Sequence, residues 1–546
     1  MKHLHIILLL LSLAISNTSN ATDYFYCDCQ AGASDQCVTG NNSNNGTSPS
    51  SPKQTFSSAN SQFGSLVAGD SLNFCRGGSF STNVQNTWVN NNCTSDNVCT
   101  VTAYDLPGNE SPQLASPIIT QQTNSTLFSL VDGGAADHEE GYTFSDLDLR
   151  CTGCASSGTG YGFFFYNDID FVTIKDISLN GFRIGVHLST GNTPNPGSDG
   201  KNSDIILNNL KIVNSKSQGI LGGADNLQIS NSYFENNGNG TMLDHNVYIS
   251  KGNGILFNNN ELYRSSLDAS GNCAGAPLVV HGIISNFVIE NNIIREDIGK
   301  AGPGCWGIAV DPGYASAESF NNITIRNNKV INVGNIGIGL TSCDTCTIEN
   351  NVILHQQAFG ATAISAPDSG RGADDLALNK VTIRNNSIYT SSPSGVGIVL
   401  GTEGSGHSIV SNAVHYVGTG KFTCFNFGLP ASAYTNIDNN TCYFPNALSS
   451  SEWEAGSGTN PNPLAAWQGQ SGFGANSQNV NPGFNNPTIP AIDFSPQNNS
   501  SAIVNKGHST SSPKDYRGKT RDSQPDAGAF EFGTYNPPAK TKIYTN

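Results

Sequence analysis

The chain has few charged residues, and few of those are positive. Only 12% of its 546 residues are Asp, Glu, Lys or Arg, and 26 basic residues stand against 42 acidic ones. So little positive charge makes a poor surface for nucleic acid, and we expect no nucleic-acid partner. An acidic polysaccharide remains open as a ligand, because a local cationic groove or a bound Ca²⁺ can reverse the sign of the charge at one site.

Long apolar segments are also missing, apart from one at the start. Residues 4–15 are mostly apolar, follow Lys2, and precede Ser19-Asn-Ala21, which places small residues three and one before a cleavage point. This pattern predicts a signal peptide over residues 1–21 and export to the extracellular space or the periplasm. No later stretch approaches the ~20 apolar residues of a membrane span, so we expect no membrane insertion.

The short motifs of several enzyme classes are absent, whereas cysteine is plentiful. There is no Gly-x-Ser-x-Gly, no phosphate-binding loop and no His-Glu-x-x-His. The 14 cysteines are an even number in an exported chain and predict up to seven disulfides. Cys151-Thr-Gly-Cys154 and Cys343-Asp-Thr-Cys346 could form a zinc site, but their wide separation and the secreted context favour disulfides that close loops.

Helical patterns are nearly absent, and one short phrase recurs instead. An apolar residue, a variable residue and two asparagines follow one another in Ile289-Glu-Asn-Asn, Ile325-Arg-Asn-Asn, Ile348-Glu-Asn-Asn and Ile383-Arg-Asn-Asn. Related phrases begin at Leu207 and end near Asn440. Their spacing of about 22 to 36 residues lies in the range that indicates stacked repeats.

Stacking explains how such short units fold. One coil cannot bury an apolar face alone, but parallel strands of successive coils pair about 4.8 Å apart and share a core. An Asn in each turn tolerates left-handed backbone dihedrals and can hydrogen-bond the Asn above and below it. The pattern therefore predicts an all-β protein folded as a right-handed parallel β-helix, in one elongated domain that we expect to be a monomer.

Both ends of the mature chain carry a resemblance to known proteins. Tyr24-Phe-Tyr-Cys27, the Asn-rich turns up to Pro52-Lys-Gln-Thr55, and Arg76-Gly-Gly-Ser-Phe80 resemble the opening of secreted β-helix repeat proteins of the polysaccharide lyase or pectate-lyase-like class. Asn481-Pro-Gly-Phe484 and the stretch from Asp515 to Glu531 resemble a C-terminal segment common to such bacterial proteins. The resemblance implies an N-terminal strand and cap over 22–64, the β-helix over 65–448, and a long loop and C-terminal capping region over 449–546.

Alternation along the strands predicts which side chains face outward. In Val247-Tyr248-Ile249 the two aliphatic residues face the core, which puts Tyr248 on the surface. By the same rule His187, His281 and Asp311 face outward. Because Tyr248, His281 and Asp311 are about one coil apart, we expect them in a column on three consecutive coils. Ordinary surface decoration of a sheet by Tyr and His is the alternative.

Several further residues are expected to border this column. Asp244, His245 and Asn246 lie at the mouth of the strand of Tyr248, and Arg264 and Arg295 follow the Asn turns of adjacent coils. A disulfide between Cys273 and Cys305 would staple two long loops beside the column. It would also hold Trp306 there as a platform for a sugar ring, unless Trp306 packs inside the coil.

A metal site is a separate hypothesis. The segment from Asp132 to Glu140 contains four acids, including Asp137, in a Gly-rich turn, and their oxygens could bind Ca²⁺. A solvated loop is the alternative. Apart from this Ca²⁺, the sequence points to no cofactor.

Secreted β-helices of this type resemble, as a class, carbohydrate-active enzymes, and three functions are open. For β-elimination from a polysaccharide that contains uronic acids, Asn246, Arg264 or a metal would neutralise the carboxylate, His281 or His245 would be the base, and Tyr248 the acid. For glycoside hydrolysis, Asp244 and Asp311 would be the carboxylate pair, with Asp268 in reserve. The third hypothesis is an adhesin that binds glycan without turning it over.

Overall fold

The computed structural model describes residues 21–533, except 109–113, 133–137, 167, 190–199, 315, 368–374, 447–449 and 456–463. Nearly all of the predicted signal peptide lies outside these residues, and so does the predicted metal ligand Asp137. Among the described residues, neither α-helix has the length and apolar composition needed to cross a bilayer.

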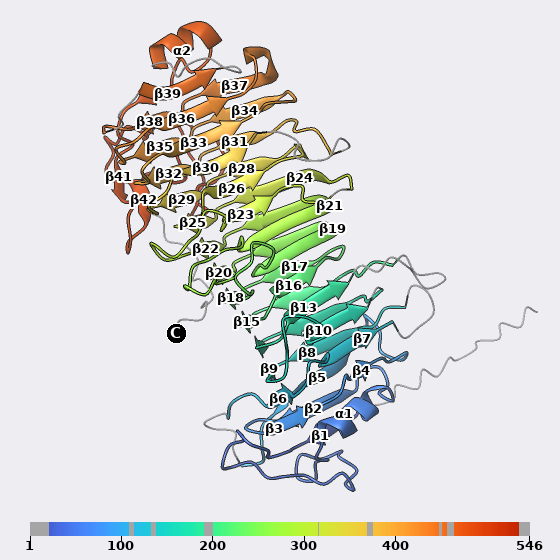
Figure 1. Ribbon diagram of the computed structural model, residues 1–546. Helices are drawn as coiled ribbons and strands as arrows, with labels where there is room; N and C mark the ends of the chain where they lie inside the picture. The colour runs from blue at the N-terminus through green and yellow to red at the C-terminus, as the bar shows by residue number, and fades with distance from the viewer. Residues whose placement is uncertain are drawn as a thin grey trace, which may run out of the picture.

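The described chain winds into a long stack of coils (Figure 1), which confirms the predicted parallel β-helix. A typical coil contributes three short strands, one to each of three faces, and each strand pairs in parallel with strands of the coils before and after it. Two of the faces count as one 26-stranded sheet, because β19 (Val247–Asn258) and β21 (Leu278–Glu290) run through the corner that joins them.

We call the three surfaces face 1, face 2 and face 3. Face 1 holds the first halves of β19 and β21 together with β4 (Thr87–Trp88), β7 (Phe128–Val131), β10 (Tyr161–Tyr166), β13 (Ile184–Ser189), β16 (Gln218–Gly222), β23 (Ile308–Val310), β26 (Ile336–Leu340), β30 (Ala361–Ala366), β33 (Gly395–Leu400), β36 (Phe422–Phe427) and β39 (Ser450–Ala455). Face 2 holds their second halves with β1 (Asp23–Tyr26), β2 (Ser71–Cys75), β5 (Cys99–Tyr104), β8 (Tyr142–Ser145), β11 (Val172–Lys175), β14 (Ile206–Asn208), β17 (Gln228–Ser230), β24 (Ser319–Arg326), β27 (Cys343–Asp344), β28 (Thr347–Glu349), β31 (Thr382–Arg384), β34 (His407–Val410) and β37 (Tyr434–Asp438). Face 3 is the 14-stranded sheet of β3 (Ser79–Thr82), β6 (Ile118–Gln121), β9 (Asp148–Cys151), β12 (Ser178–Asn180), β15 (Lys211–Val213), β18 (Tyr233–Glu235), β20 (Glu261–Tyr263), β22 (Ile293–Arg295), β25 (Lys329–Ile331), β29 (Val352–His355), β32 (Ser387–Thr390), β35 (Ala413–Tyr416), β38 (Thr441–Tyr443) and β40 (Gln478–Asn479).

The repeated phrase builds the core of the stack. Its apolar residue points inward on face 2, so that Phe257, Ile289, Ile325 and Ile348 lie directly above one another in register and are fully buried. Burial of one such side chain contributes about 1.5–3 kcal/mol. The core is therefore a continuous apolar column, and each coil depends on its two neighbours.

The two asparagines of the phrase have different roles: the first makes the left-handed turn and the second bonds neighbouring coils. The sequence had suggested both roles for a single Asn. The first, as in Asn327, takes a left-handed φ of 56° and turns the chain from face 2 to face 3. The second, as in Asn328, is fully buried, and its Oδ1 accepts the backbone and side-chain N–H groups of the Asn one coil earlier. We call the buried set the asparagine ladder, and its donor–acceptor distances are 2.9–3.2 Å through Asn260, Asn292, Asn328, Asn351, Asn386, Asn412 and Asn440.

A short helix and an aromatic cluster close the N-terminal end (Figure 1). In α1 (Phe56–Phe63) the side chain of Thr55 accepts the N–H of Ser58 and caps the helix. The ring of Phe56 lies 5.8 Å from that of Trp88, and the ring of Phe63 lies 4.8 Å from it. These rings cover the first coil, which would otherwise expose a core edge to water.

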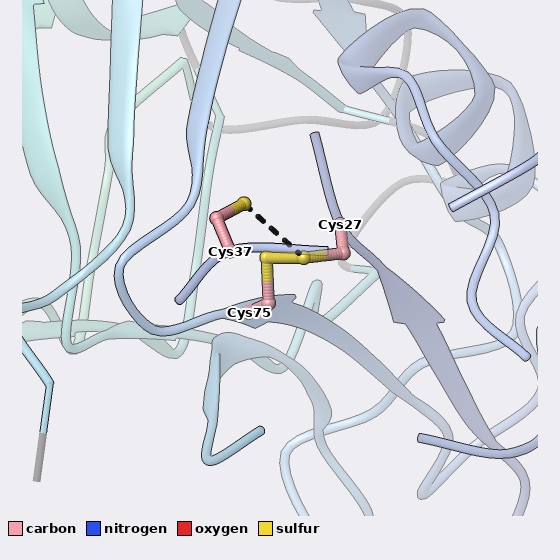
Figure 2. Close-up of side chains that lie close together, drawn as sticks. All are labelled: Cys27, Cys37 and Cys75. Atoms are coloured by element: carbon pink, nitrogen blue, oxygen red, sulfur yellow. Dashed lines mark hydrogen bonds between the residues drawn. A yellow bond between two sulfur atoms is a disulfide. The ribbon is translucent and has the colours of Figure 1, made fainter. Parts of the chain in front are cut away.

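All 14 cysteines form disulfides, as the even count predicted. Cys151–Cys154 and Cys343–Cys346 close two tight loops, and neither pair is available to zinc. Near the N-terminus, Cys27 and Cys75 join β1 to β2, and the sulfur of Cys37 lies 3.8 Å from that of Cys27 (Figure 2). Cys37 is itself bonded to Cys29, so this sulfur cluster consists of two disulfides in contact.

The C-terminal segment lies along the side of the last coils (Figure 1). From the sequence we had expected this segment to cover the open end of the stack. Its antiparallel pair β41 (Phe484–Asn486) and β42 (Asp493–Pro496) packs on the outside of face 3 in a second apolar cluster. Arg521 is buried, pairs with Glu531 at 3.1 Å, and donates to the side chain of Asn350 at 3.0 Å. The helix α2 (Leu464–Ser471) lies at the C-terminal end of the stack, in contact with β39. The 3-10 helix η1 (Ala431–Ala433) directly precedes β37.

Candidate functional site

The outer surface of face 1 carries a row of side chains in strand register. His187 lies opposite Leu221, Leu221 opposite Tyr248, Tyr248 opposite Val279, and Val279 opposite Ala309. Two neighbouring hollows follow this row, with volumes of about 250 Å³ around His187 and about 410 Å³ beyond Tyr248. We call the larger hollow the cleft; both hollows share Tyr248 and Tyr314 in their walls.

Tyr248 lies at the centre of the aromatic groups in the cleft. Its ring is 5.6 Å from the ring of His245 and 5.3 Å from the ring of His281. Its hydroxyl forms a short hydrogen bond with the hydroxyl of Tyr314. Burial, and then the contact with Tyr314, raise the pKa of Tyr248, so that its phenol keeps its proton at neutral pH.

Tyr248 and His281 are in contact, as expected for the column, but they are not directly opposite one another: His281 is shifted by two residues along its strand. His281 lies two residues beyond Val279, the residue directly opposite Tyr248, and the two rings meet along the diagonal between adjacent strands. Asp311 follows β23 at the level of His281, and its backbone N–H donates to the carbonyl of Val280 at 3.3 Å. A side-chain oxygen of Asp311 accepts the hydroxyl of Thr341 at 3.0 Å.

His245 is held in one orientation at the wall of the cleft. Its Nδ1 lies 2.9 Å from the carbonyl oxygen of Ala276. A carbonyl only accepts, so Nδ1 must carry the proton and Nε2 the lone pair in the neutral ring. Burial lowers the pKa of His245 to about 4, which keeps this ring neutral over the physiological range.

His281 is held by a buried carboxylate. Its Nδ1 lies 3.7 Å from an oxygen of Glu318, whose side chain is fully buried. The backbone N–H groups of Gly282, Gly313 and Tyr314 all donate to Glu318 and compensate its charge. Gly313 packs so closely on the imidazole that a Cβ there would lie 2.5 Å from Cε1 of His281, which requires glycine at this position.

One wall of the cleft is apolar. Trp306 lies on the outer surface of face 1 and packs with Tyr248, Val279 and Ala309, so it does not enter the coil interior. The disulfide Cys273–Cys305 ends one residue before Trp306 and joins the two loops, as predicted. Opposite them Met242 and Leu243 are 68% and 75% exposed, which is unusual for such large apolar side chains.

Two residues expected at the mouth of the strand lie elsewhere. Asn246 is fully buried and bonded to Asn237 at 2.9 Å and to the carbonyl of Tyr263, so it cannot reach a substrate. Asp244 accepts hydrogen bonds from Ser217 and from the N–H of Asn239, and it is 8% exposed. The expectation for both was wrong because they precede β19, where strand alternation does not apply.

The expectation that Arg264 and Arg295 reach the column was also wrong. Both belong to face 3, and neither lines the cleft. Arg295 pairs with Glu261 at 2.7 Å and lies 3.7 Å from the ring centre of Tyr263. Arg264 follows β20 with a φ of 51°, which turns its side chain over the same tyrosine and to 3.6 Å from Asp297.

His187 borders the smaller hollow. Its ring lies 5.0 Å from that of Tyr161 and 5.2 Å from that of Phe164, which flank it on the side away from Leu221. Burial, and then the charge of Arg183, lower the pKa of His187 to about 4. Its predicted contact with substrate therefore depends on a groove that continues from the cleft over β16.

Two residues at the cleft were not singled out from the sequence: Tyr314, which lines it, and Glu318, which is buried behind His281. Both belong to the loop that follows β23, and the turn Asp311-Pro-Gly-Tyr314 folds this loop back over the outer surface. The Pro-Gly pair was the available signal, because it marks a turn directly after an outward-facing acid.

The predicted metal turn can be described in part. Asp137 lies outside the described residues, whereas Asp132, His138 and Glu140 bring one ligand atom each to within 4.8 Å of one another. This group lies beside β7 and β8, nearer the N-terminus than the strands that line the cleft.

Comparison with known proteins supports the fold and its handedness. A family model described as the right handed beta helix region matches residues 307–462. No curated protein matches the sequence. Similar solved structures are pectate lyase Pel9A (14% identity, TM-score 0.37, 94% of this chain and 97% of that chain), the PL6 family alginate lyase AlyGC (13%, 0.47, 77% and 56%) and the Dettilon tailspike protein gp208 (12%, 0.41, 65% and 61%).

The chain thus spans 61% of the tailspike chain and 56% of the alginate lyase. At such identities and TM-scores these likenesses carry no conclusion, and the fold rests on the family model and on the pairing of the strands. The protein is a right-handed parallel β-helix, and its function has to be argued from the cleft.

Proposed function

We propose that this β-helix protein is a secreted carbohydrate-active enzyme that cleaves a linear, uronate-containing polysaccharide by β-elimination in the cleft. The observation that carries the proposal is the placement of Tyr248 between His245 and His281, all three in the wall of one hollow. The row on face 1 offers successive coils to successive sugars of a polymer. Seven disulfides support an oxidising compartment such as the extracellular space or the periplasm.

The base of the proposed reaction is His245. Its Nε2 carries the lone pair because Nδ1 donates to Ala276, and burial keeps it unprotonated. Nε2 takes the proton from the carbon next to the sugar carboxylate. The electron pair released forms a double bond to the neighbouring carbon, while the bond from that carbon to the glycosidic oxygen breaks.

The acid is Tyr248, which gives its phenolic proton to the departing oxygen. When Tyr314 donates in the hydrogen bond between the two hydroxyls, the proton of Tyr248 is free for this transfer. His245, two residues before β19, and Tyr248, on β19, both line the cleft, with their rings 5.6 Å apart. They therefore approach the sugar from one side, which corresponds to a syn elimination.

The sugar carboxylate needs a positive partner, and neither Asn246, which is fully buried, nor Arg264, which lies on face 3, can serve. Among the cleft-lining residues that the structure describes there is no Lys or Arg. We assign the role to protonated His281, which then forms an ion pair with Glu318 on its other side. The positive imidazole can stabilise the charge that develops on the carboxylate.

The described geometry is less favourable to hydrolysis by paired carboxylates. Asp311 is the one carboxylate among the described residues that line the cleft. Asp244 is held in a turn by Ser217 and Asn239, and Asp268 binds the N–H groups of its own loop at Ser270 and Asn272. Among the described residues that line the cleft, no second carboxylate thus faces Asp311 as the two hydrolytic mechanisms require, and the nearby Glu318 is buried behind His281.

The test is a panel of uronate and neutral polysaccharides. Elimination creates an unsaturated sugar end, so we expect ultraviolet absorbance to rise with at least one uronate polymer. New reducing ends without that absorbance would overturn the proposal in favour of hydrolysis. Binding to a glycan with neither product would overturn it in favour of an adhesin.

The pH profile of the same reaction tests the choice of base. Since burial lowers the pKa of His245 to about 4, we expect kcat/KM to keep its plateau well below pH 6.5 and to fall only as His245 is protonated near pH 4. An acid limb near pH 6.5 would contradict His245 and point to a solvated imidazole.

A further inference from the structure

A group of three ligand-type side chains lies in the turn between β7 and β8, away from the cleft. Atoms of Asp132, His138 and Glu140 that can bind a metal all lie within 4.8 Å of one another. Nδ1 of His138 lies 3.6 Å from Oε1 of Glu140. Asp132 directly follows β7 and Glu140 lies two residues before β8, so both are close to regular strands.

Glu140 is the unusual member of this group. Its side chain is fully buried, and among the described residues its Oε1 has no hydrogen-bond partner. Both ring nitrogens of His138 are likewise buried without a partner in the described part of the chain. Buried polar atoms without partners are costly, so Glu140 Oε1 and the imidazole of His138 indicate that these side chains are arranged to hold a further group.

The hydrogen bonds of Glu140 indicate what is missing. Its other oxygen, Oε2, accepts the backbone N–H of Asp170 at 2.5 Å, a role that an ionised carboxylate fills best, whereas Oε1 has no donor among the described residues. A cation next to Oε1 would keep Glu140 ionised and would satisfy His138 at the same time.

We propose that Asp132, His138 and Glu140 bind a divalent transition-metal ion of the zinc class. The imidazole decides the class, because Ca²⁺ takes oxygen ligands, whereas a mixed set of one nitrogen and two oxygens suits Zn²⁺ and similar ions. Two carboxylates and a neutral imidazole also balance the double charge of the ion. This assignment replaces the Ca²⁺ site with Asp132 and Asp137 that the sequence suggested.

The ion would act as a staple between coils. Glu140 reaches from the turn before β8 to Asp170, in the turn before β11, and Asp170 in turn accepts the N–H of Ser203 before β14. Three protein ligands leave a fourth tetrahedral position for water. The site is independent of the proposed elimination, and either inference can fail alone.

The test uses the full chain, stripped with a chelator and then desalted after incubation with Zn²⁺. We expect one equivalent of retained zinc and a higher thermal midpoint, and no comparable shift with Ca²⁺. Co²⁺ should give the visible absorption bands of a low-symmetry site with nitrogen and oxygen ligands. A chain that retains no zinc, or that responds to Ca²⁺ and Zn²⁺ alike, would overturn the proposal.

Variants separate this site from adventitious binding. His138→Asn and Glu140→Gln preserve volume and should each weaken zinc binding by about 100-fold or more. Asp132→Asn serves if the buried Glu140 variant does not fold. His415→Asn, which removes an imidazole from face 3, is the matched control and should bind zinc as the parent does. Equal zinc retention by the parent and the three ligand variants would contradict the assignment.

Discussion

Tyr248→Phe should lower kcat on the uronate polymer by about 100-fold to 10,000-fold, the range that general acid catalysis contributes. The variant removes only the hydroxyl that protonates the departing oxygen. The ring stays, and with it the packing against His245, His281 and Trp306. We therefore expect KM and the unfolding midpoint to change little, and initial rates from ultraviolet absorbance are the measurement.

Tyr389→Phe is the matched control for this experiment. Tyr389 lies on face 3, where its ring meets that of His415 edge to face at 5.2 Å, and burial raises its pKa as it does for Tyr248. Loss of its hydroxyl should leave the rate unchanged. If Tyr248→Phe kept full activity, or if both variants lost activity equally, Tyr248 would not be the acid.

Asn351→Ala should produce the largest loss of stability, about 3–5 kcal/mol. Asn351 stands in the middle of the asparagine ladder and is fully buried. Its removal leaves the backbone N–H of Asn328 without its acceptor and the side-chain amide of Asn328 with only the carbonyl of Ile289, and the Ile325 carbonyl and Asn386 Oδ1 each lose a donor. Each such buried group costs about 1–3 kcal/mol when unpaired. Urea unfolding followed by far-ultraviolet circular dichroism measures the change.

The control for the ladder is Asn327→Gly. Asn327 is the first asparagine of the phrase in the preceding coil, so it does not belong to the buried ladder. Asn327 supplies a left-handed φ of 56°, which glycine adopts without strain, and its side chain is only half-buried. We expect a change within about 0.5 kcal/mol. A loss below about 1 kcal/mol for Asn351→Ala would mean that water replaces the missing amide.

The fold could be predicted because every coil has to meet the same physical requirements, and therefore the same residue types recur in each coil. Each coil must bury an apolar residue, turn sharply and bond to its neighbours, and the phrase around Ile325 supplies one residue for each task. The outward positions of Tyr248 and His281 followed from the same regularity, since alternation holds inside a strand. Leu278 and Val280 are in the core, as that argument required.

The rest of the candidate site depends on residues outside the strands. Asn246 comes one residue before β19 and Arg264 one residue after β20, so alternation did not fix their directions. Tyr314 reaches the cleft through a loop whose path depends on the contacts of Glu318. The two-residue shift between Tyr248 and His281 depends on pairing between coils, which one sequence does not reveal.

The C-terminal segment has a consequence for the order in which the molecule assembles during synthesis. Coils contact only their neighbours, so they can stack one after another as the chain emerges. Arg521, however, bonds to Asn350, a residue 171 positions earlier in the chain. The flank of the last coils therefore stays open until almost the whole polypeptide has been made, and a prematurely terminated chain would remain exposed to proteases there.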